Sequence, residues 1–187
     1  MNLNKLAAFA TLALTLAGFS PALFALASDK SQPIYISSDR AERNEKLGVT
    51  TYTGSVEMNQ GTLQIHADKV VIHSINNEIT RIIATGSPAE YQQKPATDKQ
   101  LVIARGNKIE YLLDTEKLHL TGNASLRQGD GTMLTGKLIN YDTKESVVRA
   151  EGNTNSSAPE RIHMVIPPKA KAEPQNNSSS SSSNPSQ

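Results

Sequence analysis

The chain has 187 residues, of which 37% are hydrophobic, 20% are charged and only 4% are aromatic, and it contains no cysteine. This length predicts one folded domain, and the lack of cysteine excludes disulfides and cysteine nucleophiles. The 19 basic and 18 acidic residues nearly balance, whereas a nucleic-acid-binding protein usually carries a basic excess. We therefore expect no nucleic-acid partner.

The N-terminal segment is organised like a secretory signal peptide. Lys5 supplies a positive charge, residues 6–17 form a largely apolar run without charge, and Ala25-Leu26-Ala27 has the small-x-small pattern of a signal-peptidase site. The alternative, an uncleaved membrane anchor, fits less well because the apolar run is shorter than the roughly 20 residues of a membrane-spanning helix. We expect cleavage after Ala27, which removes Lys5 and leaves a formally neutral protein.

The segment from residue 34 to about residue 166 has the pattern of β-strands joined by short turns. Apolar and polar residues alternate, as at Leu118 and Leu120, and turn signals such as Asn76-Asn77 recur about every ten residues. The polar tail at 169–187 contains a run of serines and cannot bury a core, so it is predicted to be disordered. The predicted organisation is a cleaved signal peptide at 1–27, a single β-domain at 28–168 and this tail.

A hairpin-sized unit of about 30 residues repeats along the β-segment. We interpret a recurring dipeptide as the end of a strand in each copy: Thr53-Gly54, Thr85-Gly86, Thr121-Gly122 and Glu151-Gly152. A single hairpin cannot bury its own apolar face, whereas stacked copies can. The repetition therefore predicts a stack of hairpins.

Residue parity predicts which side chains face the interior, because residues i and i+2 of a strand lie on the same side of a sheet. The predicted inner set is Val70, Ile72, Ile109, Tyr111, Leu113, Leu118, Leu120, Ala124, Leu126, Ile139 and Tyr141. The opposite parity is largely polar, so two such sheets folded over each other would enclose an apolar interior. Whether that interior is incompletely filled or a solid sandwich is left open by the composition.

The two ends of the stack are predicted to be open sheet edges. The first is PIYISS at 33–38 and the last is ERIHMVIP at 160–167, and neither is strongly guarded by charge. Unpaired strand edges either aggregate or accept another strand. A chain with one open edge at each end can also grow head to tail, because such a contact is heterologous.

No catalytic constellation is recognisable in the sequence. There is no Gly-x-Ser-x-Gly elbow and no glycine-rich phosphate loop before a helix. His66 and Asp68 could hold a metal ion together, but His73 lies on the opposite parity, and two ligands without a third make a weak site. We expect no catalytic residues, no metal and no cofactor, and we regard an enzyme acting on polysaccharide as the least favoured class.

Four segments carry a resemblance to a known family: QPIYISSDRAE, YTGSVEMNQGTLQIHADKVVI, GSPAEYQ and LTGNASLRQ. Together they resemble the OstA-like (LptA) family, specifically its periplasmic bridge proteins of lipopolysaccharide transport, over about residues 32–167. The resemblance implies an all-β fold: an open, twisted antiparallel β-jellyroll of about sixteen strands, whose apolar groove shelters the acyl chains of lipid A. It also implies a periplasmic location.

The resemblance further implies partners and contact residues. The partners would be lipopolysaccharide, an inner-membrane LptC-like jellyroll protein, an outer-membrane LptD-like translocon, and further copies joined head to tail. From family positions and residue parity, we expect the lipid A groove to be formed by Ile34, Ile36, Tyr91, Ile109, Tyr111, Leu113, Ile139 and Tyr141. We expect the partner-binding edges to contain Pro33, Ile34, Tyr35, Ile36, Ile162, Met164 and Ile166. The alternative is a structural periplasmic adaptor that joins partners by strand pairing and binds no lipid.

Overall fold

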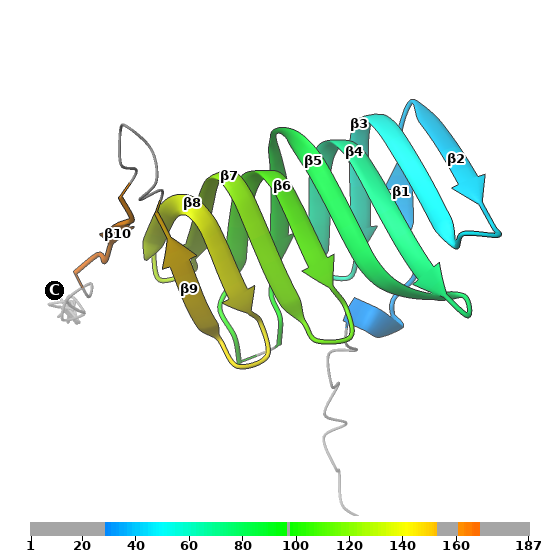
Figure 1. The fold of residues 1–187 in the computed structure, drawn as a ribbon. Helices are drawn as coiled ribbons and strands as arrows, with labels where there is room; N and C mark the ends of the chain where they lie inside the picture. The colour runs from blue at the N-terminus through cyan, green and yellow to red at the C-terminus, as the bar shows by residue number, and fades with distance from the viewer. Residues whose placement is uncertain (1–28, 97, 153–160, 169–187) are drawn as a thin grey trace, which may run out of the picture.

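A computed structural model of the chain describes residues 29–96, 98–152 and 161–168. The predicted signal peptide at 1–27 and the serine-rich tail at 169–187 lie outside the described residues. The described part consists of β-strands and one short 3-10 helix, and no helix in it is long and apolar enough to span a membrane. The elements, drawn in Figure 1, are η1 (Asp29–Ser31), β1 (Tyr35–Ser37), β2 (Arg40–Asn44), β3 (Val49–Gln60), β4 (Leu63–Ile75), β5 (Glu78–Gln93), β6 (Val102–Leu112), β7 (Lys117–Gln128), β8 (Met133–Asp142), β9 (Val147–Glu151) and β10 (His163–Val165).

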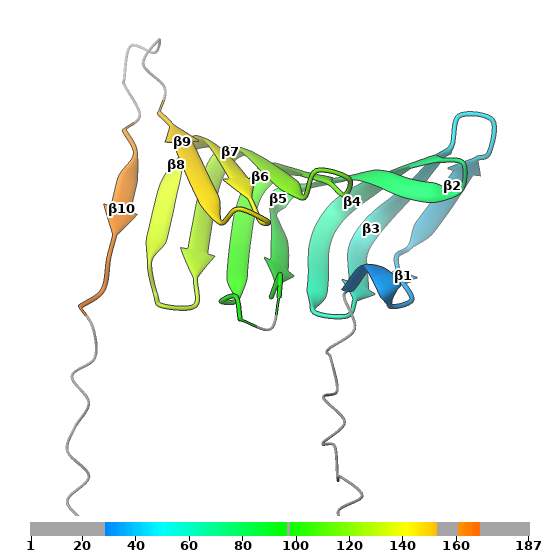
Figure 2. The ribbon, with the colours of Figure 1, turned by 90° about the horizontal axis from the view of Figure 1, so that it is seen from below.

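All ten strands belong to one antiparallel sheet in the order β1-β3-β4-β5-β6-β7-β8-β10, with β2 also pairing with β3 and β9 with β8. Figure 2 shows η1 and β1 near one end of this sheet and β10 at the other. The all-β, open, antiparallel prediction is confirmed. The count of about sixteen strands is not confirmed, since the described residues form ten strands in a single sheet. The long strands stay hydrogen-bonded on both sides of a bend and are not split into two.

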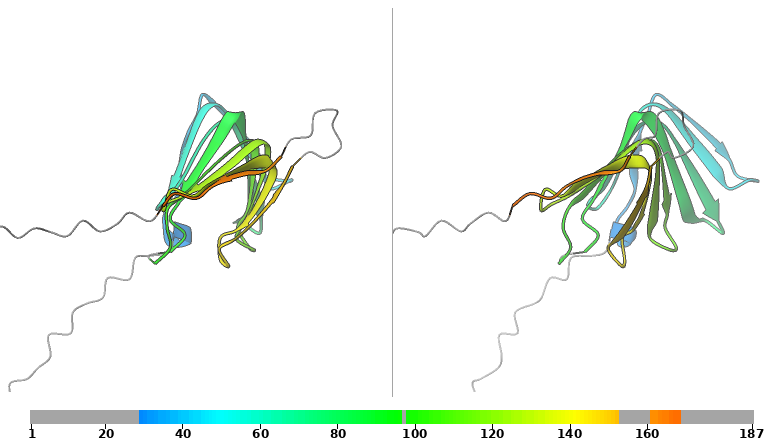
Figure 3. Two further views of the ribbon diagram at one scale, coloured as in Figure 1. Left: turned by 90° about the vertical axis from the view of Figure 1, so that its left-hand side faces the viewer. Right: turned by 60° about the vertical axis from the view of Figure 1, so that its left-hand side comes forward.

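The sheet is folded along a line that crosses the middle of its long strands, so that its two halves face each other as a V (Figure 3). Register shifts mark this line in successive strand pairs, as between Thr53 and Val56 of β3 and between Thr121 and Ala124 of β7. Gly54 and Gly122 lie on it with φ of 84° and 73°, a left-handed conformation that only glycine adopts readily. Such bulges bend a strand and increase its twist.

The repeated dipeptides therefore have a different role from the predicted one. Thr53-Gly54, Thr85-Gly86 and Thr121-Gly122 lie inside β3, β5 and β7 and not at strand ends, so that interpretation is wrong for these three. Their glycines turn the strand through the fold line while the sheet continues. Only Glu151-Gly152 follows the prediction, since β9 ends at Glu151.

We call the two halves of the V the first and the second arm. The first arm ends at the β3–β4, β5–β6 and β7–β8 connections, and the second arm ends at the β2–β3, β4–β5, β6–β7 and β8–β9 connections. The inner surfaces of both arms carry the core. The predicted inner residues are buried with the exception of Leu113, which is partly buried, so the parity prediction is confirmed.

Candidate functional site

A groove with a mixed polar and apolar lining opens at the end of the V formed by β1 to β5. Its volume is about 1050 Å³. The apolar side chains that line it are Ile34, Ile36, Leu47, Tyr52, Ile72, Ile75 and Ile79. Arg43, Glu45 and Lys46, next to the β2–β3 turn, add charged groups to its lining. Thr50, Ser74, Asn76 and Asn77 add uncharged polar groups, so the groove combines an apolar strip with a larger polar and charged rim.

This groove contains only part of the predicted binding set. Ile34 and Ile36 line it and are partly buried against the core. The core proper, farther along the V, holds Tyr91, Ile109, Tyr111, Ile139 and Tyr141, all buried. Leu113, the remaining predicted residue, is partly buried against this core. The interior is therefore filled by the chain's own side chains over most of its length and is accessible near β1.

The buried tyrosines connect the two arms inside the core. Tyr91 comes from the first arm and Tyr111 from the second, and their rings meet edge to face with centroids 5.6 Å apart. The Tyr91 hydroxyl donates a hydrogen bond to Oε1 of Gln93. Burial raises the pKa of Tyr91 well above its usual value, and it raises the pKa of Tyr111, with a smaller contribution from Glu116, to about 12. Both hydroxyls are therefore protonated at neutral pH.

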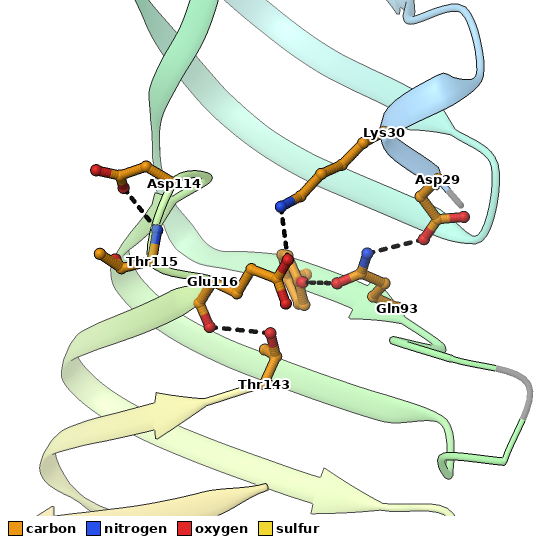
Figure 4. A network of polar contacts seen from close by, with 8 residues as sticks. Asp29, Lys30, Gln93, Asp114, Thr115, Glu116 and Thr143 are labelled. Carbon is orange, nitrogen blue, oxygen red and sulfur yellow. Dashed lines mark hydrogen bonds and ion pairs between the residues drawn. The ribbon is translucent and has the colours of Figure 1, made fainter. Parts of the chain in front are cut away.

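A polar network crosses the mouth of the V above these tyrosines (Figure 4). The Asp29 carboxylate accepts hydrogen bonds from the backbone N–H and the hydroxyl of Thr62 at 2.6 and 2.7 Å, and from Nε2 of Gln93 at 2.8 Å. Lys30 Nζ lies 2.6 Å from Oε1 of Glu116. Thr62 lies in the β3–β4 turn and Gln93 ends β5, both on the first arm, whereas Glu116 lies in the β6–β7 turn of the second arm. Sequence reasoning assigned these residues no role, so the network was missed.

The predicted sheet edges exist, but each consists of two short strands. Ile36 points inward, while the neighbouring Tyr35 is 67% exposed. Pro33, just before β1, is exposed as well. At the other end, exposed apolar side chains surround β10: Ile162, Met164, Val165 and Ile166. In the described part of the chain β1 and β2 pair only with β3, and β9 and β10 only with β8, so both edges have free backbone groups. The prediction named only the segments of β1 and β10 as edges, and it did not include β2 and β9, which complete these edges.

The polar residues that alternate with the buried ones lie on the outer face of the sheet. Arg81 lies 3.4 Å from Glu110 and 3.3 Å from Nε2 of His73, forming a cluster on the second arm. Among the residues that the structure describes, no group of three His, Cys, Asp or Glu side chains could hold a metal ion. His66 and Asp68, which could have formed a two-ligand site, are both exposed.

Comparison with known proteins identifies the family. The family described as LptA/(LptD N-terminal domain) LPS transport protein matches residues 35–147. The chain belongs to this family. It is 38% identical over 164 residues to the lipopolysaccharide export system protein LptH of Pseudomonas aeruginosa, which covers 86% of this chain and 93% of that protein. It is 36% identical over 168 residues to LptA of Haemophilus influenzae, which covers 88% of this chain and 92% of that protein.

A solved structure supports the same assignment. The crystal structure of LptH from Pseudomonas aeruginosa, described as the LptA-homologous periplasmic component of the conserved lipopolysaccharide transport device, superposes with a TM-score of 0.68 at 36% identity. The match covers 75% of this chain and 99% of that chain. The predicted family is confirmed, and so is the prediction of a transport component as opposed to an enzyme, because these homologues are lipopolysaccharide transport proteins.

Proposed function

We propose that the protein is a periplasmic lipopolysaccharide-binding protein that shields the acyl chains of lipid A and bridges the inner-membrane and outer-membrane transport complexes. The observation that carries the lipid part is the groove near β1, whose lining includes Ile34, Ile36, Ile72 and Ile79. Its apolar lining is continuous with the inner face of the V, because Ile72 belongs to the buried core and Ile36 packs against it.

The physical need for such a groove is large. Each methylene group of an acyl chain that is exposed to water costs about 0.8 kcal/mol, so a lipid with several chains cannot cross an aqueous compartment unshielded. In this proposal the acyl chains insert beside Ile36 and extend along the inner face toward Tyr111. The sugars and phosphates stay in water at the opening of the groove near β1, close to the cations Arg43 and Lys46. A formally balanced chain holds this anionic lipid loosely enough to release it.

A pair of neighbouring residues in β1 gives a matched test of lipid binding. Ile36 lines the groove, whereas Tyr35 is 67% exposed on the opposite side of the strand. We expect Ile36→Asp to weaken lipopolysaccharide binding about tenfold or more, because one buried apolar side chain contributes about 1.5–3 kcal/mol. Tyr35→Asp serves as the control and retains binding. Far-UV circular dichroism verifies that both variants fold.

The outcome also decides between this function and the adaptor without lipid. The observation that favours the adaptor is the complete burial of Tyr91, Ile109 and Ile139, since this part of the core leaves a cavity of only about 40 Å³ beside Tyr111. If the folded wild type binds no lipopolysaccharide, the sheet acts as a strut. A photo-crosslinking residue at Ile36 or Tyr111 labels the lipid if the groove is used, and one at exposed Lys117 does not.

The bridging part of the proposal rests on the two open edges. We propose that residues 33–38 pair with the LptC-like protein and that residues 160–167 pair with the next copy or with the LptD-like translocon. Exposed strand edges accept further strands, and a heterologous contact of this kind extends without closing. Removal of 160–187 deletes β10 and abolishes self-association and translocon binding, whereas removal of 169–187 leaves β10 in place and preserves both. Equal behaviour of the two truncations in light scattering and pull-down experiments contradicts this assignment.

A further inference from the structure

The short helix η1 connects the two arms of the V across its mouth. Asp29 is anchored to the first arm through the three hydrogen bonds from Thr62 and Gln93, and Lys30 reaches Glu116 on the second arm. We call Asp29 and Lys30, with these three partners, the clasp. Figure 4 shows Asp29 and Lys30 projecting from the same turn toward different parts of the sheet. The partners of the clasp lie 33, 64 and 86 residues from it along the chain.

The two sides of the clasp differ in strength. On the first arm, a carboxylate accepts three short hydrogen bonds, and Gln93 is itself a buried side chain; charge-assisted hydrogen bonds of this kind are the strong ones. The chain that follows is held as well, since Nε2 of Gln60 donates to the backbone oxygen of Gln32 at 3.1 Å. On the second arm there is one ion pair, between side chains that are 48% and 34% exposed. A partly exposed ion pair is weak, so the clasp opens at Lys30–Glu116.

The second arm presents Glu116 in a fixed position. The backbone oxygen of Glu116 accepts hydrogen bonds from both the backbone N–H and the hydroxyl of Thr143, each at 2.9 Å, and Thr143 is buried. Glu116 also has a φ of 55°, which places it in the left-handed region at the tip of the turn. The β6–β7 turn is therefore held to the neighbouring β8–β9 turn, so the backbone of Glu116 is fixed and its carboxylate lies at the mouth of the V within reach of Lys30.

Directly beneath the clasp lie the tyrosines that join the arms. A cavity of only about 40 Å³ remains there, lined by Tyr111, Gln93 and the clasp itself, whereas the groove near β1 measures about 1050 Å³. A volume of 40 Å³ accommodates about one water molecule. An acyl chain therefore cannot reach Tyr111 through the mouth while the clasp is closed.

We propose that residues 29 and 30 are a gate on the groove: lipid acyl chains occupy the section lined by Tyr91 and Tyr111 only after the Lys30–Glu116 ion pair has opened. The inference rests on the proposed lipid-binding function. It assigns a role to a segment that precedes the sheet and belongs to neither edge. When Lys30 separates from Glu116 of the second arm, Asp29 keeps its hydrogen bonds to the first arm, so η1 stays attached there.

The chain offers a matched control for testing this gate. Arg105 and Glu90 form an ion pair of 2.7 Å with exposures of 49% and 30%, close to the values for Lys30 and Glu116, but it joins neighbouring strands on the outer face. We expect Glu116→Gln to accelerate association of fluorescently labelled lipopolysaccharide about two- to five-fold, the range for loss of one partly exposed ion pair. Glu90→Gln leaves the rate unchanged. The double reversal Lys30→Glu/Glu116→Lys restores the wild-type rate.

Because the chain contains no cysteine, the gate can also be locked selectively. In a Lys30→Cys/Glu116→Cys variant, a short, reducible bis-thiosulfonate crosslinker joins the two cysteines. We expect this locked variant to lose lipopolysaccharide labelling at a photo-crosslinking residue placed at Tyr111. Reduction with dithiothreitol restores the labelling. The same crosslinker in Glu90→Cys/Arg105→Cys has no effect. If wild type binds and the locked protein is labelled equally well, the gate is refuted while lipid binding stands. If wild type binds no lipopolysaccharide at all, the proposed function itself fails.

Discussion

The fold line of the sheet yields a stability prediction that can be worked out residue by residue. Gly122 lies on this line with φ of 73°, and a Cβ atom added there would lie 2.8 Å from Nδ2 of Asn107. An L-residue in the left-handed region costs about 1–2 kcal/mol. The added Cβ would also lie 3.0 Å from Cβ of Asn107, which side-chain rotation does not move, so this contact places the cost at the upper end of that range. We expect Gly122→Ala to reduce the free energy of unfolding by about 1–2 kcal/mol.

Urea unfolding followed by far-UV circular dichroism measures this loss. With a slope of about 2 kcal/mol per molar urea, the midpoint falls by about 0.5–1 M. Two further variants separate the cost of the left-handed backbone conformation from the cost of the contact with Asn107. Gly122→Asn also adds a Cβ but tolerates positive φ better than alanine, so it should lose less. Asn107→Ala combined with Gly122→Ala removes the contacts with Nδ2 and Cγ but keeps the one with Cβ, and it should keep most of the loss. The reasoning is refuted if Gly122→Ala is as stable as the wild type, or if Gly122→Asn is the less stable of the two.

Three further predictions concern buried and titrating groups. Tyr91→Phe removes the hydrogen bond to Oε1 of the buried Gln93, which also has Tyr111 as a partner, and should destabilise the fold by about 0.5–1.5 kcal/mol in urea; an unchanged midpoint would contradict the importance of this hydrogen bond. Tyr111 has its pKa raised to about 12, so the unfolded chain releases this proton first, near pH 10, and stability is lost as the pH rises from there through 12. Alkaline unfolding of Tyr111→Phe should lack that part of the loss, and an identical pH profile would show that the residue does not contribute. Burial, followed by the charge of Arg81, lowers the pKa of His73 below 6.5; the unfolded state then binds more protons, so stability should fall as the pH drops below 6.5, and His73→Gln should show a shallower acid slope.

The inner face of the sheet was predictable because it depends only on parity. Ile109 and Tyr111 are two residues apart in one strand, and burial follows from the period of 2 whatever the strand order. The fold line was not recognised because the alternation of polar and apolar residues does not report it. The local signal was nevertheless present: Gly54-Ser55 and Gly122-Asn123 pair glycine with a small polar residue, and all four have positive φ.

The missed elements lacked a pattern that sequence reasoning can use. All five residues of β2 are exposed, so no alternation shows how the strand is placed, and its pairing with β3 at the edge of the sheet was not predicted. Asp29 and Lys30 belong to a segment without periodicity, and their partners come from distant turns that the fold brings to the mouth of the V. The groove near β1 is likewise a property of how far the arms separate at the end of the sheet, which composition does not determine.

The pairing order of the sheet has a consequence for how the molecule is built. From β3 to β8 every strand pairs with the strand that follows it in the sequence, so each step of assembly closes only a short loop. Such local pairing lowers the entropy lost before contacts form and favours fast folding for a β-protein. A chain that emerges N-terminus first can add its hairpins one at a time onto a finished template. The same arrangement allows the sheet to vary in length: inserting or deleting one hairpin lengthens or shortens the V and leaves the order of the other strands unchanged.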